Sequence, residues 1–123
     1  MKIWLVALLL FAPPLCRAQG NELVVEFSRA NSLSGVVLDQ QDVPFPKIAV
    51  YRIECGKGEF RGIIPPVILQ QTQTDANGNF AFSRKDHNRT CLQVMTPGFD
   101  MLQVEVRYAR SAGKLKLKLH VGA

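Results

Sequence analysis

Apolar and polar residues alternate along short runs of this chain, and turn-forming residues separate the runs. A period of two places alternate side chains on opposite faces of a β-strand. No stretch keeps a helical period over three turns, so an all-β domain is expected. The alternation predicts seven strands, at residues 32–39, 48–55, 67–74, 79–83, 91–96, 101–108 and 114–121.

The last two predicted strands show the alternation most clearly. Residues 102, 104, 106 and 108 are apolar or aromatic, and residues 114–121 alternate three lysines and a histidine with four apolar residues that end at Val121. Tyr108 and Val121 therefore fall in the core-facing phase. The lysines are expected either to form a solvated face that deters edge-to-edge aggregation or to attract anionic polymers or lipid head groups.

A tight turn is predicted at Asp75-Ala76-Asn77-Gly78, because Asn-Gly readily adopts the positive φ values that such turns need. The turn predicts a hairpin that leads into a strand with Phe80 and Phe82 on one face. Asp75, Asn77 and Asn79 also resemble the start of a calcium loop. Phe80 stands where an EF-hand needs glycine, so a turn in which Asp75 bonds its own backbone is favoured.

The segment 56–66 is rich in glycine and proline and predicts a long loop. Loops carried on a rigid sandwich are frequent binding sites, so Phe60, Arg61, Ile63 and Ile64 are candidate contact residues. The alternative is that these side chains cover an open end of the sandwich.

Residues 1–18 follow the order of a secretory signal peptide: Lys2, ten apolar residues, two prolines and a small-residue site ending at Ala18. The apolar run is too short to cross a bilayer. Cleavage after Ala18 is expected, and lipidation at Cys16 is disfavoured because Leu15 precedes it. Residues 19–31 then form a loose arm or an extra strand, and residues 32–123 form the domain.

Removal of the signal peptide determines the expected size and charge of the mature chain. Removal of 18 residues from 123 leaves 105, the size of one domain. Lys2 and Arg17 leave with the signal, so 13 basic residues face 10 acidic ones and the net charge falls from +5 to +3. This charge is too small to indicate nucleic acid. We expect a periplasmic or secreted protein with no transmembrane segment in the mature chain.

Cys55 and Cys91 are the two cysteines that remain after cleavage, and an even count in an oxidising compartment favours a disulfide. The alternative is a pair of buried thiols. Cys91 is opposite in phase to Leu92, so the bond is expected on a face or at the rim of the core.

The chain resembles the carboxypeptidase regulatory-like domain. The matching residues are Gly35-Val36-Val37-Leu38-Asp39, then Pro46 with Ile48 and Val50, then residues 72–80 (TQTDANGNF), and finally Pro97-Gly98-Phe99. The resemblance implies a seven-stranded prealbumin-like (Ig-like) β-sandwich whose shared residues are structural and not catalytic. Arg52 departs from the family pattern, and it predicts a bulge or register change in the second strand.

No arrangement of residues in the sequence predicts catalysis, a metal or a cofactor. His87 and His120 lack metal-ligand spacing, and no serine lies in a nucleophile motif. Intradiol dioxygenases of related fold bind iron through two tyrosines and a closely spaced pair of histidines. Tyr51 and Tyr108 match the tyrosine count, but the two histidines here are far apart in the sequence. Hydroxyisourate hydrolases end in Tyr-Arg-Gly-Ser, and this chain does not. We therefore expect a non-catalytic exported module that contacts an unknown envelope protein or glycan through its loops. The alternative is a small transthyretin-like hydrolase or ligand-binding protein with a site at an oligomer interface.

Overall fold

The computed structural model describes residues 22–83 and 88–122, and within them the chain forms eight β-strands and no helix. The all-β prediction is confirmed, and each of the seven predicted runs overlaps an observed strand. The strands are β1 (Leu23–Ala30), β2 (Ser34–Leu38), β3 (Ala49–Ile53), β4 (Ile68–Gln73), β5 (Asn79–Ala81), β6 (Arg89–Val94), β7 (Met101–Tyr108) and β8 (Leu115–Lys118).

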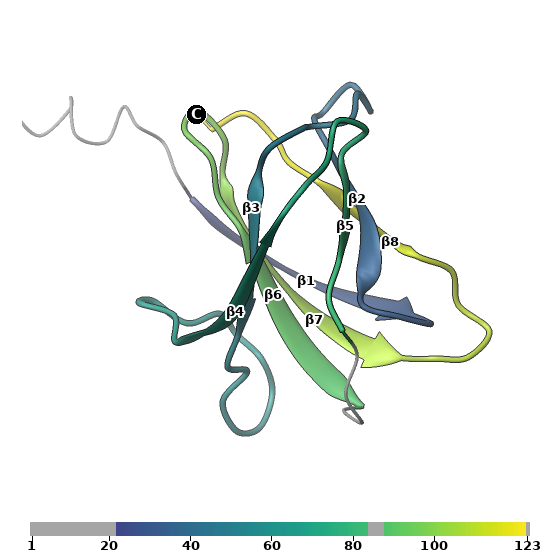
Figure 1. Ribbon diagram of the computed structural model, residues 1–123. Coiled ribbons are helices and arrows are strands. Elements are labelled where there is room, and N and C mark those ends of the chain that lie inside the picture. The colour runs from purple at the N-terminus through teal and green to yellow at the C-terminus, as the bar shows by residue number, and fades with distance from the viewer. Residues whose placement is uncertain (1–21, 84–87, 123) are drawn as a thin grey trace, which may run out of the picture.

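The strands form two sheets that enclose one core in the manner of a β-sandwich (Figure 1). The larger sheet has the order β1-β7-β6-β3-β4, and the smaller has the order β5-β2-β8. The pairs β1–β7 and β2–β8 are parallel, whereas the other pairs are antiparallel. The strands β1 and β4 therefore lie at opposite edges of the same sheet.

The segment 19–31, predicted as an arm or an extra strand, contains the strand β1. It pairs with β7 over its whole length, from Leu23 opposite Met101 to Ala30 opposite Tyr108. Val24 packs against the core and Ala30 is buried within it. These contacts make β1 part of the domain.

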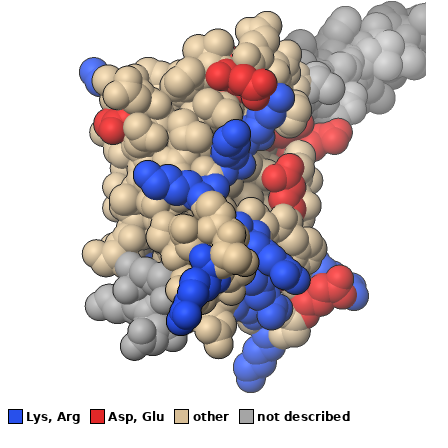
Figure 2. Space-filling model, turned by 90° about the vertical axis from the view of Figure 1, so that its right-hand side faces the viewer, with Lys and Arg blue, Asp and Glu red and all other residues tan. Residues whose placement is uncertain are grey.

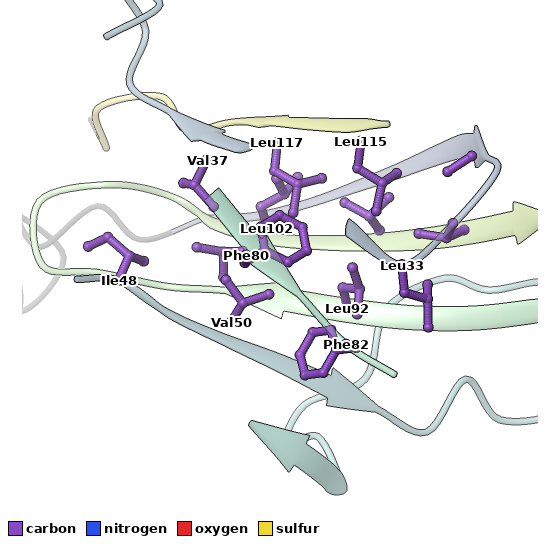
Figure 3. Close-up of a cluster of buried hydrophobic side chains, with 14 of the residues drawn as sticks. Leu33, Val37, Ile48, Val50, Phe80, Phe82, Leu92, Leu102, Leu115 and Leu117 are labelled. Atoms are coloured by element: carbon purple, nitrogen blue, oxygen red, sulfur yellow. The ribbon is translucent and has the colours of Figure 1, made fainter. Parts of the chain in front are cut away.

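The core lies between the inner faces of the two sheets (Figure 3). The larger sheet contributes apolar residues such as Leu92 and Leu102, and the smaller sheet contributes Phe80 and Leu117. Two core predictions are wrong, because Tyr108 and Val121 are 41% and 54% exposed. Tyr108 is the last residue of β7, and β8 ends at Lys118, so both side chains lie past the ends of the enclosed region.

The turn at residues 75–78 forms as predicted, but the hairpin does not. Asp75 Oδ1 accepts hydrogen bonds from the N–H groups of Asn77 and Asn79 at 2.8 and 2.9 Å, and Gly78 has φ 77°. After this turn β5 pairs with β2 and not with β4, so the chain crosses between the sheets. The buried Thr74 fixes the crossing, since its hydroxyl accepts a hydrogen bond from Ile48 N and donates one to the carbonyl of Phe45, both at 2.8 Å.

The predicted irregularity beside Arg52 is confirmed. The register of β3 against β4 shifts between Arg52 and Ile53. Arg52 Nε donates a hydrogen bond to Gln70 Oε1 at 3.1 Å, so its charged group points toward the neighbouring strand and not into the core.

The predicted signal peptide at residues 1–18 and His87 lie outside the described residues. In the part of the chain that the structure describes, no helix has the length and apolar character needed to cross a membrane.

Candidate functional site: a loop clamped over the larger sheet

The loop between β3 and β4 covers part of the outer face of the larger sheet. Along β6 and β7, Leu92, Val94, Leu102 and Val104 face the core, so the alternate residues face outward. These outward residues are nevertheless buried: Cys91, Gln93, Gln103 and Glu105 are each 5% exposed or less. The loop thus covers a face of the sheet and not an open end of the sandwich.

Phe60 anchors the loop in a second, smaller apolar cluster. It is 2% exposed and clusters with Ile53 and Cys91, and Ile63 packs against the same cluster. The prediction that Phe60 is an exposed contact residue is therefore wrong, and Ile63 is only partly exposed. Both side chains remove apolar area from water by packing on the outer face of the sheet.

The disulfide between Cys55 and Cys91 is present, with the Cα atoms 5.4 Å apart and 36 residues of separation. Cys91 lies on the outer face, opposite in phase to Leu92, as expected. The bond joins the start of the loop to β6 and forms part of the smaller cluster beneath Phe60.

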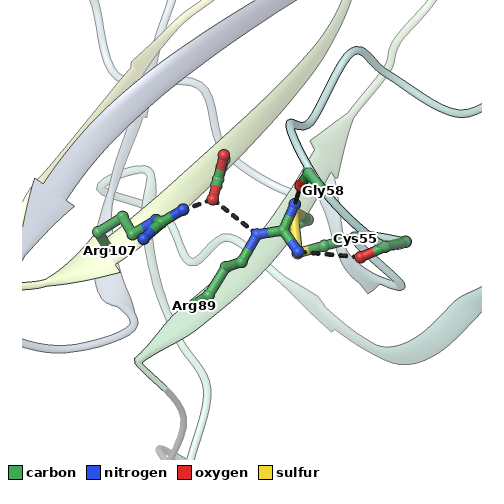
Figure 4. A network of polar contacts seen from close by, with 7 residues as sticks. Cys55, Gly58, Arg89 and Arg107 are labelled. Atoms are coloured by element: carbon green, nitrogen blue, oxygen red, sulfur yellow. Dashed lines mark hydrogen bonds and ion pairs between the residues drawn. A yellow bond between two sulfur atoms is a disulfide. The ribbon is translucent and has the colours of Figure 1, made fainter.

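Three charged side chains form a second attachment, which we call the arginine clamp (Figure 4). Glu105 Oε2 accepts hydrogen bonds from Arg89 Nε at 2.7 Å and from Arg107 Nε at 2.9 Å. The terminal nitrogens of Arg89 donate to the carbonyls of Gly56 and Gly58 at 2.9 and 2.7 Å. Arg89 therefore connects the buried carboxylate directly to the loop backbone.

Two opposing effects determine the pKa of Glu105. Burial raises the pKa, whereas the hydrogen bonds and positive charges of Arg89 and Arg107 lower it, and the net shift is downward from the usual value. The carboxylate is therefore ionised at neutral pH. It holds two guanidinium groups and is a poor proton donor.

Gln103 holds the far end of the loop. Its side-chain oxygen accepts a hydrogen bond from Ile63 N at 2.8 Å, and its side-chain nitrogen donates to the Ile63 carbonyl at 2.9 Å and to Gln93 Oε1 at 2.7 Å. The amide thus satisfies both backbone groups of Ile63. Sequence reasoning missed these polar residues because Gln93, Gln103 and Glu105 alternate with apolar residues and so match a solvent-facing pattern.

Arg61 and Ile64 are the two candidate contact residues that point to solvent. The side chain of Arg61 is 83% exposed and its ion pair with Glu59 is 3.8 Å long, while Ile64 is 66% exposed. Ile64 is followed by Val67, Ile68 and Leu69, which are 50%, 53% and 46% exposed. These apolar residues and the rest of β4 make up residues 64–73, which we call the edge segment.

The edge segment also presents unpaired backbone. β4 is the last strand of its sheet, with β3 as its neighbour. Thr74 N donates to the Ile48 carbonyl and Thr74 O accepts from Lys47 N, so the backbone of Thr74 faces the β3 side. By the alternation of an antiparallel ladder, the N–H and C=O groups of Gln71 and Gln73 face away from the sheet. No Asp, Glu, Lys or Arg occurs between residues 64 and 74.

No group of three or more His, Cys, Asp or Glu residues that could hold a metal ion is found among the described residues. His120 is exposed at the end of the domain.

Neither a scan against protein-family models nor a search of curated proteins gives a match.

Proposed function

We propose that this chain is an exported, non-catalytic binding module that holds a strand of another protein against its edge segment. The observation that carries the proposal is the run of exposed apolar residues, Ile64, Val67, Ile68 and Leu69, beside the unpaired backbone of β4. Main-chain hydrogen bonds would supply affinity and the apolar side chains would supply specificity. A prealbumin-like relationship of the fold, as the sequence resemblance implies, belongs to the same proposal.

Charge supports a strand-accepting edge. Natural sheets usually protect exposed edges with charged residues, proline or irregular strands. Glu26 and Arg29 occur on β1, and Lys116 and Lys118 occur on β8. β4 carries no charge, and the interruptions of the edge segment are Pro65 and Pro66, which precede the strand, and the register shift beside Arg52. The partner strand is therefore expected to be uncharged where it meets β4.

The order of residues in β4 favours a different protein over a second copy. Its first residues, Ile68 and Leu69, are apolar, whereas residues 70–73 are Gln, Gln, Thr and Gln. A two-fold antiparallel pairing over the whole strand would place Ile68 opposite Gln73 of the other copy. A foreign strand with matching polarity would avoid this mismatch.

The arginine clamp and the disulfide support binding because they hold the loop before any partner arrives. Arg89, Gln103 and Cys91 fix the loop at three separate places. A surface that is already ordered loses less conformational entropy on association.

A photo-crosslinking amino acid placed at Gln71 tests the proposal in the exported fraction, with Gln41, which is exposed in another loop, as the control position. We expect one protein to crosslink at Gln71 and not at Gln41. The purified partner should bind Ile68→Lys about tenfold more weakly than the wild type. Val43→Lys is a matched control, because Val43 and Ile68 are 52% and 53% exposed, and it should bind normally.

Three results would overturn the proposal. They are equal crosslinking at both positions, equal effects of the two lysine substitutions, and crosslinks formed only with a second copy of the chain.

A further inference from the structure

The outer face of the larger sheet has an uncovered half at the edge opposite β4. In the register of β1 and β7, Phe27 lies beside Glu105 and Arg29 beside Arg107. These side chains share the outward phase of Glu105 but lie beyond the loop, and Phe27 is 60% exposed. A shallow hollow of about 550 Å³ is lined here by Phe27, Ser28, Arg29, Arg107, Tyr108 and Ala109. We call it the basic hollow.

The arginine clamp orients one of the two arginines of the basic hollow. Arg107 Nε is held at 2.9 Å from Glu105 Oε2, and the carboxylate is 1% exposed, while the Arg107 side chain is 60% exposed. The fixed Nε leaves the terminal nitrogens of Arg107 available to a ligand. A guanidinium that is already positioned loses less freedom when it binds an anion.

Arg29 contributes an uncompensated charge. Among the described residues its side chain has no hydrogen-bond or ion-pair partner, and it is exposed. Glu105 pairs with Arg89 and Arg107, and Arg29 adds a third positive charge beside Arg107, so the described residues here carry more positive than negative charge.

Further basic residues extend the positive surface around the adjacent flank of the sandwich. Arg110 lies in the turn that follows β7, Lys114 directly precedes β8, and Lys116 lies within β8. This turn is attached to β1, because Asn31 N donates to the Gly113 carbonyl and Ala109 N donates to the Ala30 carbonyl. Figure 2 shows Lys and Arg side chains gathered on this flank, with acidic side chains mainly toward its margins.

We propose that the basic hollow binds an acidic glycan, with Arg29 and Arg107 on its anionic groups and Phe27 against the apolar face of a sugar ring. Guanidinium groups bind carboxylates and sulfates through paired, charge-assisted hydrogen bonds. An exposed aromatic ring provides a flat apolar surface beside them. The shallow, open hollow and the adjoining basic flank suit a polymer lying across the surface. This site is independent of the edge segment and lies at the opposite edge of the sheet.

Isothermal titration with oligogalacturonate, which carries a carboxylate on every sugar, tests the site, and its methyl ester is the neutral control. Oligogalacturonate should bind and the ester should not. Arg29→Gln and Phe27→Ala should each weaken binding about tenfold. Arg61→Gln removes the same charge from an exposed position in the loop and should change binding less than twofold, since Arg61 does not line the hollow and its charge is paired with Glu59.

Inorganic phosphate and vesicles with anionic lipids distinguish other sources of the same charge. The proposal predicts that neither competes for the site at concentrations where oligogalacturonate saturates it. It is overturned if the ester binds equally well, if Arg61→Gln and Arg29→Gln have equal effects, or if Phe27→Ala binds normally. Preferential binding to the vesicles would also overturn it. Unchanged thermal unfolding of each variant, measured in parallel, ensures that a loss of binding is not a loss of fold.

Discussion

At the scale of single residues, Glu105 connects the fold to both proposed binding surfaces. Its carboxylate is buried on the outer face of the sheet, where it holds Arg89 against the loop and Arg107 beside the basic hollow. A buried carboxylate is costly unless it is paired and hydrogen-bonded, and here one oxygen receives two guanidinium groups. One side chain thus determines the positions of groups on two neighbouring strands.

Glu105→Gln should lower the free energy of unfolding by about 2 kcal/mol at pH 7, because two guanidinium groups lose their charged acceptor. The pKa of Glu105 is lower in the folded chain, so its stabilisation is complete above the unfolded-state pKa of about 4.3 and is lost as the pH falls through the folded value. The difference between the wild type and the variant should therefore shrink below about pH 4. Urea unfolding across pH measures this, and a constant difference would contradict the account.

Glu59→Gln is the matched control for that measurement. Glu59 pairs with Arg61 at 3.8 Å with both side chains largely exposed. An exposed pair of this kind contributes little, so the substitution should change stability by less than about 0.5 kcal/mol at any pH.

Phe60→Ala should destabilise the domain by about 3 kcal/mol, because a fully buried aromatic side chain leaves a cavity over the disulfide. Ile64→Ala, four residues away and 66% exposed, should have almost no effect on stability. Thermal unfolding of the two variants separates the anchoring residue from the contact residue. Equal losses of stability would show that the loop does not divide in this way.

At the scale of secondary-structure elements, sequence periodicity predicts the strands but not the surface that each face meets. The seven runs were recognisable because a strand needs only alternation and turn residues at its ends. The burial of Gln93 and Gln103 was not recognisable, since it depends on a loop returning over the sheet. The turn at Asp75 was similarly predictable from local hydrogen bonding, whereas the pairing of β5 with β2 depends on the whole topology.

Loss of the Cys55–Cys91 disulfide should destabilise the domain by about 3 kcal/mol, because the bond closes a long stretch of chain. Hydrogen exchange in the loop should increase more than exchange in β2 and β8, because these strands lie in the other sheet. The double variant Cys55→Ser/Cys91→Ser provides the comparison without a reducing agent. A uniform increase across both sheets would contradict a local role for the bond.

At the scale of the whole molecule, the larger sheet has different chemistry at its two edges. β4 offers apolar side chains and free backbone groups, while β1 offers Arg29 and an exposed aromatic ring beside Arg107 of β7. The three strands β7, β6 and β3 lie between these two edge strands, so the proposed protein and glycan partners do not compete for the same surface. The net charge in the sequence indicated a basic protein, but not which edge of which sheet carries the charge.

Export predicts a defined mass for the protein recovered outside the cytoplasm. Cleavage after Ala18 gives a chain that begins Gln19-Gly20-Asn21, with or without cyclisation of its terminal glutamine, and the disulfide removes two hydrogens from the mass. Intact mass spectrometry without reduction measures both features. A product that retains Met1, or a mature chain with two alkylatable thiols, would contradict the prediction.

Hydrogen exchange at individual amides of β4 tests the central claim, strand addition at the edge segment, most directly. In the free chain the amides of Gln71 and Gln73 should exchange rapidly and that of Thr72 slowly, because only the last faces β3. Binding of the crosslinked partner should slow exchange at Gln71 and Gln73 and leave Thr72 slow. Rapid exchange at Gln71 and Gln73 in the complex, or slow exchange at both in the free chain, would contradict the account.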